Sequence, residues 1–388
     1  MKIFKPYSEL VATTLSGLES VCADEIAELG GKEPEVLSRA VRFTGSKEEV
    51  YRMNYSCRTA LRILMPLAEF RVNGMEDFYG QIRQLGWEQW MEADQTLAIE
   101  SVGSHPLFPN TMFASQKAKD AIADRFRERC NRRPSVDLDN AQIRIHVHLH
   151  PDQVRISLDS SGTPLFKRGY RMASVQAPLN EVLAAGLIRL SDWDGEMPFF
   201  DPFCGSGTLA IEAAMIRSRR PAGSFRKNWS LMNWSDFDKP LWEKTVQEAK
   251  SDILPLNTEI HASDIDAGNL NVARRNISAA GLEGQITTTR SAFENFPFPD
   301  RPGFILTNPP YGERLREFDQ ISFYKGLGNV LKKNCPAYQA WILGSDANAM
   351  KFIGLKPDKK FNVYNGQLAC RFMKYSLFSG KRKDHLSQ

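Results

Sequence analysis

The sequence predicts an α/β protein in two parts, an α+β module followed by a domain with a mostly parallel, doubly wound sheet. Two observations lead to this division. The chain of 388 residues exceeds the usual size of a single hydrophobic core. Its pattern also changes near residue 161, where mixed strands and helices give way to a regular alternation of helix and strand. We therefore place the first domain at 1–160 and the second at 161–388.

The first domain is predicted to carry a mixed or antiparallel sheet. Strand patterns cover residues 7–15, 40–43, 62–70 and 97–102, and helical patterns cover residues 17–29, 47–57, 78–85 and 115–129. The segment 142–159 alternates between apolar and polar residues on both sides of Pro151, which indicates a hairpin.

The second domain begins after the glycine-rich, basic connector SSGTPLFKRGYR. Its predicted elements are helix 178–190, strand 197–203, helix 208–217, strand 259–264, helix 267–280, strands 286–289 and 303–307, helix 321–334 and strand 338–343. Residues 218–256 interrupt this order with three tryptophans, Trp229, Trp234 and Trp242. We favour a packed excursion, and an RNA-contacting flap built on Arg219, Arg220, Arg226, Lys227 and Trp229 is the alternative.

Composition excludes several classes of protein. The apolar runs are shorter than the roughly 18 residues that a membrane span needs, and the start of the sequence lacks a signal-peptide core, so we expect a cytoplasmic protein without membrane contact. The six cysteines form no C-x-x-C pair, which argues against a zinc site or disulfides. His146, His148 and His150 alternate along one strand. We assign them to its polar face and expect no bound metal.

Charge is unevenly distributed along the chain. Residues 1–165 carry 20 Lys+Arg and 23 Asp+Glu, a net charge of −3, whereas the remainder carries 30 and 23, a net charge of +7. The second half is therefore better suited to attract a polyanion. The segment 113–133, which contains a predicted helix, has seven basic and three acidic residues. A solvated face explains it adequately, and nucleic-acid contact is the alternative.

The stretch FFDPFCGSGTLAIEAA, residues 199–214, predicts a strand, a glycine turn and a helix that starts at Thr208. Glycines let the backbone approach a ligand, and the start of a helix favours an anionic group. Gly205 and Gly207 formally fit a dinucleotide fingerprint, but the carboxylate of Asp201 would repel a pyrophosphate and suits an ammonium group. A P-loop is excluded because no Gly-Lys-Ser/Thr follows.

The second motif is ILTNPPYGERL, in which two consecutive prolines exclude a helix or a central strand and predict a rigid loop after a strand. DPFCGSG, ASDID and NPPY, in this order, resemble the motifs of class I S-adenosylmethionine-dependent amino-methyltransferases, which have a Rossmann-like fold. The resemblance implies these cofactor-binding residues: Asp201, Pro202, Phe203, Cys204, Gly205, Ser206, Gly207, Thr208, Asp264, Ile265, Asp266, Ala292, Phe293, Asn308, and the closing residues Gln176 and Leu179. It implies Asn308, Pro309, Pro310 and Tyr311 as catalytic residues.

The NPPY loop can be interpreted chemically. An exocyclic amine on a nucleobase is a poor nucleophile because its lone pair is delocalised into the ring. The side-chain oxygen of Asn308 and the carbonyl of Pro309 could accept its hydrogens and orient the lone pair, and Tyr311 could stack on the base. The same tetrapeptide type serves adenine-N6, cytosine-N4 and guanine-N2 amines, so the loop alone leaves the base open.

The first 160 residues resemble a ferredoxin-like segment followed by a THUMP domain with its core at about 45–160, a module of RNA-modifying enzymes. The whole arrangement is similar to the guanine-N2 half of bacterial 23S rRNA methyltransferases. This implies S-adenosylmethionine as cofactor, S-adenosylhomocysteine as product, and RNA, with 23S rRNA first, bound by the THUMP module and the basic methyltransferase surface. Adenine-N6 methylation of DNA or RNA, guanine-N2 methylation of tRNA, and a non-catalytic ribosome assembly factor are the alternatives. The oligomeric state stays open.

Overall fold

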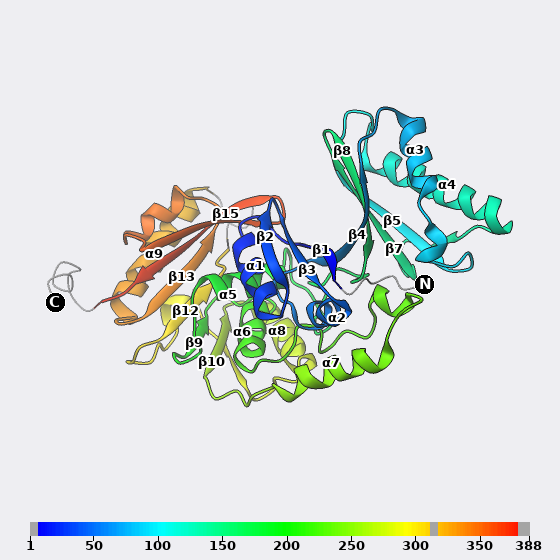
Figure 1. Cartoon of the computed structure of the whole chain (residues 1–388). Coiled ribbons are helices and arrows are strands. Elements are labelled where there is room, and N and C mark those ends of the chain that lie inside the picture. Colours follow the sequence, from blue (N-terminus) through cyan, green and yellow to red (C-terminus); the bar gives the residue numbers. More distant parts are fainter. Residues whose placement is uncertain (1–6, 311–316, 379–388) are drawn as a thin grey trace. The chain divides into compact units, whose positions relative to one another are not determined.

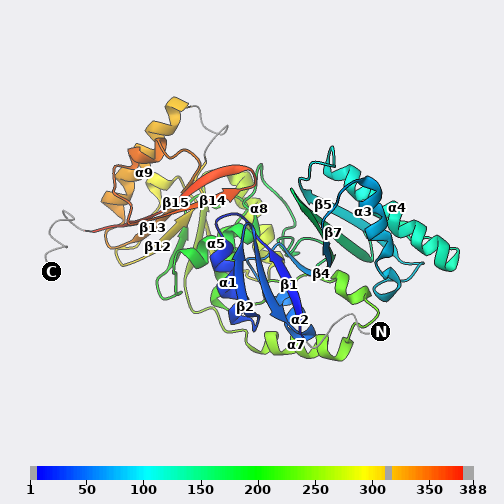
Figure 2. The ribbon, with the colours of Figure 1, turned by 45° about the horizontal axis from the view of Figure 1, so that its top comes forward.

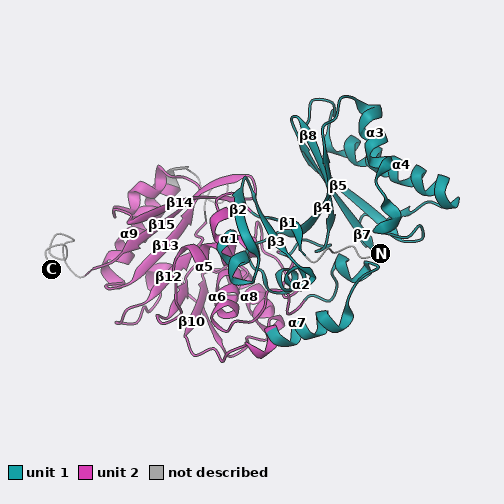
Figure 3. Ribbon diagram, viewed as in Figure 1, with its two compact units in different colours: residues 1–14, 23–165, 226–248 teal, residues 15–22, 166–225, 249–388 magenta. Residues whose placement is uncertain are grey.

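The computed structural model describes residues 7–310 and 317–378 (Figure 1). It divides into two compact units (Figure 3). Unit 1 comprises residues 1–14, 23–165 and 226–248, and unit 2 comprises residues 15–22, 166–225 and 249–388. The chain therefore passes repeatedly from one unit to the other. No helix within the described part of the chain is long and apolar enough to cross a bilayer.

Unit 1 contains an eight-stranded mixed sheet. Its strands are, in spatial order, β2 (Lys32–Leu37), β3 (Ala40–Gly45), β1 (Ser8–Thr13), β4 (Arg62–Phe70), β8 (Gln153–Asp159), β7 (Ile143–His150), β5 (Thr96–Gly103) and β6 (Ser135–Val136). The helices of this part of the chain are α1 (Glu19–Glu28), α2 (Lys47–Ser56), α3 (Met75–Gln84) and α4 (Thr111–Cys130). Figures 1 and 2 show α3 and α4 together beside β5 and β7. The sequence patterns missed β2, because KEPEVL shows no alternation and contains a proline.

The predicted hairpin is confirmed, since β7 and β8 pair antiparallel with His150 opposite Gln153. Ile145, Val147 and Leu149 are at most 2% exposed and face the core, as predicted. The histidines lie on the other face of β7, where His146 is also buried. No group of three or more His, Cys, Asp or Glu side chains among the described residues is arranged to hold a metal ion.

The tryptophan-rich excursion packs against unit 1 through η2 (Ser230–Asn233) and α7 (Lys239–Ser251). Trp229, Trp234 and Trp242 are 4%, 3% and 7% exposed. The indole of Trp229 donates to the carbonyl of Asn54 at 3.1 Å, and Tyr51 meets Trp242 edge-on at 5.5 Å. These contacts confirm the packed interpretation for the tryptophans, because an indole buried in this way offers no face to a ligand.

Unit 2 contains a seven-stranded sheet. Its strands are, in spatial order, β11 (Ile286–Arg290), β10 (Ile260–Asp264), β9 (Phe199–Asp201), β12 (Phe304–Thr307), β13 (Gln339–Gly344), β15 (Leu368–Ser376) and β14 (Lys359–Asn365). The helices of the unit are α5 (Glu181–Leu190), α6 (Thr208–Arg217), α8 (Ala267–Ala279) and α9 (Glu317–Asn334), with the short turns η3 (Phe293–Asn295) and η5 (Ala349–Ile353). Figures 1 and 2 place α9 on the opposite side of the sheet from α5 and α6.

The strand order agrees with the predicted doubly wound sheet and adds an antiparallel edge. Strands β11, β10, β9, β12 and β13 are parallel, and β15 and β14 add an antiparallel hairpin that the sequence patterns missed. Strand β9 lies between β10 and β12, so the chain reverses its direction of winding there. Ligands of such sheets bind at the carboxyl ends of the strands beside this reversal.

Candidate active site

The two sequence motifs meet at the carboxyl ends of β9 and β12. These strands pair in parallel, with Phe199 beside Phe304. Asp201 ends β9, and one of its carboxylate oxygens accepts a hydrogen bond of 2.8 Å from the hydroxyl of Thr307, the last residue of β12. Asn308 follows directly. The hydrogen bond therefore holds the start of the NPPY loop next to the glycine turn.

Asp201 is a buried carboxylate whose partners are neutral. It is 1% exposed, and it accepts hydrogen bonds from Thr307 and, at 3.4 Å, from the amide of Phe203. Its pKa is raised to about 7, mainly by burial and also by the nearby Asp264 carboxylate, although the two hydrogen bonds oppose the shift. A buried carboxylate of this kind is stabilised by a cation, and an ammonium group is the cation that the sequence predicted.

The glycine turn leads from β9 into α6. Gly205 and Gly207 have φ values of 52° and 80°, in the left-handed region that favours glycine. A Cβ on Gly207 would also lie 3.2 Å from the Cβ of Ala273 on α8. Helix α6 begins at Thr208, so its first amides and its positive end face the turn. The backbone conformation therefore favours glycine at both positions, and the close approach of α8 favours it further at Gly207.

The acidic residues after β10 have different roles in the structure. The Asp264 carboxylate accepts from the amide of Gly205 at 3.0 Å and from the amide of Asp266 at 2.9 Å, so it joins the β10 loop to the glycine turn. Asp266 is the N-cap of α8 and accepts from the amide of Asn269 at 2.8 Å. Between the two carboxylates, Ile265 is 66% exposed. An exposed isoleucine beside a carboxylate offers an apolar surface to a planar ligand.

A cavity lies at the glycine turn and brings together most of the cofactor-binding residues predicted between 201 and 208. Its lining residues are Val175, Ala177, Pro178, Leu179, Asp201, Phe203, Cys204, Gly205, Ser206, Thr208, Leu209 and Asn308. Burial raises the pKa of the Cys204 thiol well above its usual value, which keeps the thiol protonated. Gln176 is exposed beside this lining without being part of it.

Other predicted residues lie outside the cavity lining: Pro202, Gly207, Asp264, Ile265, Asp266, Ala292, Phe293, Pro309 and Pro310. Tyr311 lies outside the described residues. Phe293 is 3% exposed, and its ring packs on Phe203 with 5.4 Å between ring centroids. Since Phe203 lines the cavity, Phe293 supports the cavity wall from behind.

The side-chain oxygen of Asn308 is buried and has no hydrogen-bond partner among the described residues. An unpaired buried acceptor costs about 1–3 kcal/mol, so it favours a ligand that donates a hydrogen bond. The Asn308 oxygen, the buried Asp201 carboxylate and the glycine turn are thus chemically suited to the predicted cofactor and an adjacent amine donor. An ammonium group would meet Asp201, and the amides at the start of α6 would meet an anionic carboxylate.

Sequence reasoning missed Arg171, which holds the cavity wall together. Its guanidinium donates to the carboxylate of Glu181 at 2.7 Å, to the carbonyl of Leu179 at 2.9 Å, and to the hydroxyls of Ser206 and Thr208 at 3.0 Å each. It thus ties the segment 171–179 to the glycine turn. In the sequence, Arg171 is only one of several bases in the connector, and nothing local distinguishes it.

Asn276 was also missed. Its side chain is 1% exposed on α8. Its oxygen accepts from the amides of Met172 and Ala173 at 2.9 and 3.1 Å, and its nitrogen donates to the carbonyls of Ala173 and Ser206 at 3.1 and 3.0 Å. One amide therefore fastens the segment 171–179 and the glycine turn to the same helix. The available sequence signal was a polar residue next to Ile277 on the buried face of α8.

Comparison with known families assigns most of the chain. Residues 168–374 match the family described as the RMKL-like methyltransferase domain. Residues 72–159 match the THUMP domain, and residues 9–64 match the family described as the RlmL ferredoxin-like domain. The boundary predicted at 160/161 falls between the THUMP match and the methyltransferase match, and it stays a prediction.

Two proteins of known sequence are similar over most of this chain. A candidate RNA methyltransferase of Synechocystis sp. is 35% identical over 376 residues, which cover 96% of this chain and 97% of that protein. The ribosomal RNA large subunit methyltransferase K/L of Syntrophotalea carbinolica is 36% identical over 379 residues, or 94% of this chain and 53% of that protein. The chain spans about half the length of this second relative.

A solved structure is similar as well. The crystal structure of SMU.472, a candidate methyltransferase bound to S-adenosylhomocysteine, superimposes with a TM-score of 0.86 at 29% identity. The match covers 97% of this chain and all of that one. S-adenosylmethionine is accordingly the cofactor of this protein, as the motifs predicted.

We expect S-adenosylhomocysteine to release protons when it binds near pH 7. At a pKa of about 7, about half of the Asp201 carboxyls are protonated in the free protein, and the ligand's ammonium group favours the ionised form. Affinity should therefore be full above pH 7 and fall as the pH is lowered. Titration calorimetry in buffers of different ionisation enthalpy measures the release. Asp201→Asn should abolish it, and Glu283→Gln, an exposed change in the same unit, should not.

Asn276→Ala is expected to weaken S-adenosylhomocysteine binding about tenfold, because four backbone groups lose their hydrogen-bond partner and the segment 171–179 is released. Tryptic cleavage at Arg171 should become faster in this variant and slow down again with saturating ligand. Asn271→Ala, an exposed change on the same helix, is the control. Cleavage of Asn276→Ala at the wild-type rate would contradict this role.

Proposed function

The chain belongs to the RMKL-like methyltransferase family, and from this membership we propose that it transfers a methyl group from S-adenosylmethionine to the guanine-N2 amine of a nucleotide in 23S rRNA. The observation that carries the proposal is the buried oxygen of Asn308, which has no partner in the part of the chain that the structure describes and lines the same cavity as Asp201. When bound, S-adenosylmethionine supplies an electrophilic methyl group. The remaining chemistry is the orientation of the amine.

The residues around the glycine turn would hold the cofactor. Asp201 would bind its ammonium group, and the first amides of α6 would bind its carboxylate. Asp264 would accept from the ribose hydroxyls, with Ile265 against the adenine. Ala292, which has no polar side chain, would contribute a backbone group to the adenine.

The NPPY loop would hold the target amine. The side-chain oxygen of Asn308 and the carbonyl of Pro309 would accept its two hydrogens, which draws the nitrogen toward a tetrahedral geometry and turns its lone pair to the methyl group. Pro309 and Pro310 restrict the backbone and keep both acceptors in place. Tyr311 would stack on the base. No strong base is needed, because the amine loses its proton after the methyl group has been transferred.

Three findings support RNA as the substrate. Residues 72–159 match the THUMP domain, and both relatives named above are RNA methyltransferases by name, one of them acting on large-subunit rRNA. Residues 166–388 carry a net charge of +7, which suits a polyanion. The choice of guanine rests on the resemblance to the guanine-N2 half of the 23S rRNA enzymes, since the NPPY loop accepts any exocyclic amine.

The product identifies the base. We expect the purified protein to transfer a methyl group to 23S rRNA from a strain that lacks the gene, and nucleoside mass spectrometry should show N2-methylguanosine. Native 23S rRNA from the parent strain should accept little, because its site is already modified. Detection of N6-methyladenosine would show that the target base is adenine and not guanine. Methyl transfer to tRNA alone would show that the substrate is tRNA and not 23S rRNA.

Asn308→Ala should lose turnover while it keeps the cofactor. We expect the rate to fall about 100-fold or more, which is typical for the loss of a preorganised polar group that acts in the transition state. Affinity for S-adenosylhomocysteine should stay within about threefold, because Asp201 and the glycine turn remain. Single-turnover transfer and calorimetry measure the two quantities, with Asn257→Ala, an exposed asparagine, as control. Equal losses of rate and affinity would contradict the assigned role.

A further inference from the structure

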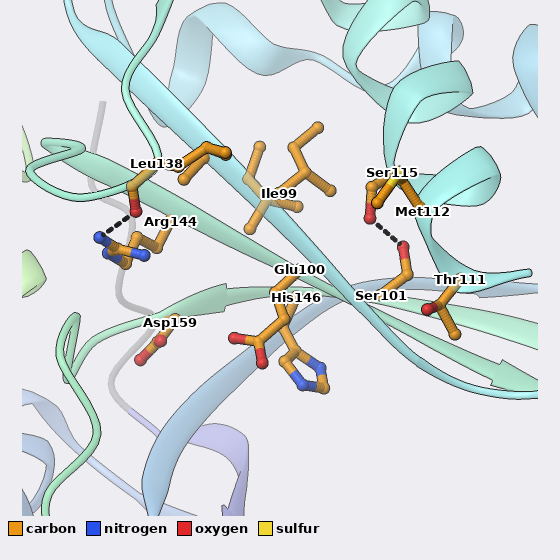
Figure 4. Close-up of a pocket in the computed structure, with 12 residues that line it drawn as sticks. Ile99, Glu100, Ser101, Thr111, Met112, Ser115, Leu138, Arg144, His146 and Asp159 are labelled. Atoms are coloured by element: carbon orange, nitrogen blue, oxygen red, sulfur yellow. Dashed lines mark hydrogen bonds between the residues drawn. The ribbon is translucent and has the colours of Figure 1, made fainter.

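The sheet of unit 1 has a cavity of about 320 Å³ beside β5, but its polar side chains do not converge (Figure 4). Ser101 is hydrogen-bonded to Ser115 of α4 at 2.7 Å on one face of the sheet. Glu100 and His146, which are neighbours in the register of β5 and β7, project to the other face. The strand separates the two groups, so we assign no ligand to this cavity. In unit 2, by contrast, one hairpin carries its exposed polar groups on a single face.

The hairpin of β14 and β15 stands beside the candidate active site. Thr307, the last residue of β12, lies opposite Ile342 of β13, and Ile342 lies opposite Met373 of β15. Neighbouring strands lie about 4.8 Å apart, so about 10 Å separates β12 from β15 at this level. Because Asn308 follows Thr307, the backbone of the hairpin is about this far from the start of the NPPY loop.

The hairpin also extends beyond this level. The central strand β13 ends at Gly344, whereas β14 and β15 stay paired as far as Asn365 and Leu368. Leu368 is five residues past Met373, and a strand rises about 3.3 Å per residue, so the hairpin reaches about 16 Å beyond the end of β12. It therefore forms a wall at the edge of the sheet where ligands bind.

Exposed side chains cover one face of this wall. Alternate residues of a strand, and opposite residues of an antiparallel pair, project to the same face. The face that carries Met373 therefore also carries five exposed residues, which together are called the hairpin face: Lys360, Asn362, Tyr364, Ala369 and Arg371. On the opposite face, Val363, Cys370 and Phe372 are at most 3% exposed. A partner of the hairpin would therefore meet the hairpin face.

The hairpin is positively charged. Residues 359–376 contain four Lys+Arg and no Asp or Glu. Two of the four cations lie on the face opposite the hairpin face and are engaged there. Lys359 pairs with Asp192 at 2.9 Å, and the ammonium group of Lys374 lies 5.9 Å from the ring centroid of Trp341. The other two cations belong to the hairpin face.

Lys360 and Arg371, the cations of the hairpin face, have no acidic partner within residues 7–310 and 317–378. The guanidinium of Arg371 donates to the side-chain oxygen of Asn362, a neutral group that keeps it on this face. Both positive charges are therefore available to a phosphate.

Tyr364 adds an aromatic ring to the two cations. It is 38% exposed and lies opposite Ala369, which has only a methyl group to cover the ring. Arg371 is its diagonal neighbour on the same face, and such neighbours lie about 7–8 Å apart, within reach of long side chains. An aromatic ring beside a guanidinium suits an unpaired nucleotide, because the ring stacks on a base and the cation binds a phosphate.

We propose that the hairpin face binds an unpaired nucleotide of the RNA substrate that flanks the methylated one. The base of this nucleotide stacks on Tyr364, and the phosphates on its two sides contact Arg371 and Lys360. Stacking does not depend on the identity of the base, so the hairpin holds the strand in place while the NPPY loop selects the amine. The inference rests on the proposed function, because it takes RNA as the substrate.

Single-turnover methyl transfer to 23S rRNA from a strain that lacks the gene, measured at increasing rRNA concentration, tests the stacking contact. Tyr364→Ala should raise the half-saturating rRNA concentration about tenfold, the size of one stacked base, and Tyr364→Phe should stay within about twofold of the wild type because the ring remains. Phe378→Ala is the matched control. It removes a ring of similar exposure, 41%, just past the opposite end of β15, and it should leave the half-saturating concentration unchanged.

The salt dependence of the half-saturating concentration tests the phosphate contacts. Arg371→Gln and Lys360→Gln should each lower the slope of log affinity against log salt concentration by about 0.7, the value for one phosphate contact of a single strand. Lys359→Gln removes the same charge from the adjacent residue on the opposite face, and it should keep the wild-type slope.

Two outcomes would overturn the hairpin face as a nucleotide site: a wild-type half-saturating concentration in Tyr364→Ala, or an equal increase in Phe378→Ala. Equal slopes in Lys359→Gln and Arg371→Gln would overturn the phosphate contacts. Each of these results leaves the proposed function intact, since the wild-type protein methylates the rRNA in the same assay. Absence of transfer by the wild type would overturn the proposed function, and this inference with it. Affinity for S-adenosylhomocysteine should equal that of the wild type in Tyr364→Ala, which shows that the variant is folded.

Discussion

The hydrogen bond from Thr307 to Asp201 fixes the ends of two neighbouring parallel strands, and the active site is arranged around it. Strand β9 brings the glycine turn and the start of α6, and β12 brings Asn308. The strands pair through their backbones, so the relative position of the two motifs is set by the sheet and does not depend on either loop. A site on strand ends is more rigid than a site on loops alone. This rigidity suits a reaction that depends on orientation more than on a strong base.

The same region carries groups that destabilise the protein when no ligand is bound. Within residues 7–310 and 317–378, the buried Asp201 carboxylate has no cationic partner and the buried Asn308 oxygen has no hydrogen-bond donor. Each of these groups would be more stable in water than in the free protein. Each becomes satisfied when a ligand supplies the missing charge or hydrogen. Relief of these unfavourable interactions therefore contributes to the free energy of ligand binding, as is common at functional sites.

The segment 171–179 forms one wall of the cofactor cavity, yet little of it is buried. It is held from one side by the guanidinium of Arg171 and from the other by the amide of Asn276. Amide and guanidinium groups of this kind make several directional bonds each, so they fix a polar segment that has few apolar contacts.

Residues 226–248 are held in place mainly by apolar packing. They join unit 1 through buried indoles, and in this way an excursion from the second half of the sequence becomes part of the first unit.

The sequence by itself determined the order of helices and strands over 178–217 and 259–343, the hairpin at 142–159, and the glycine turn and NPPY loop as the parts of a site. These features follow from local periodicity and from residues with restricted backbones. Both are properties of a short stretch of chain and do not depend on distant contacts. Only the tertiary structure decided what depends on distant contacts. The burial of Asp201 comes from neighbouring strands, the β14–β15 hairpin is fixed by pairing with β13, and Asn276 meets Met172 across 104 positions of the chain.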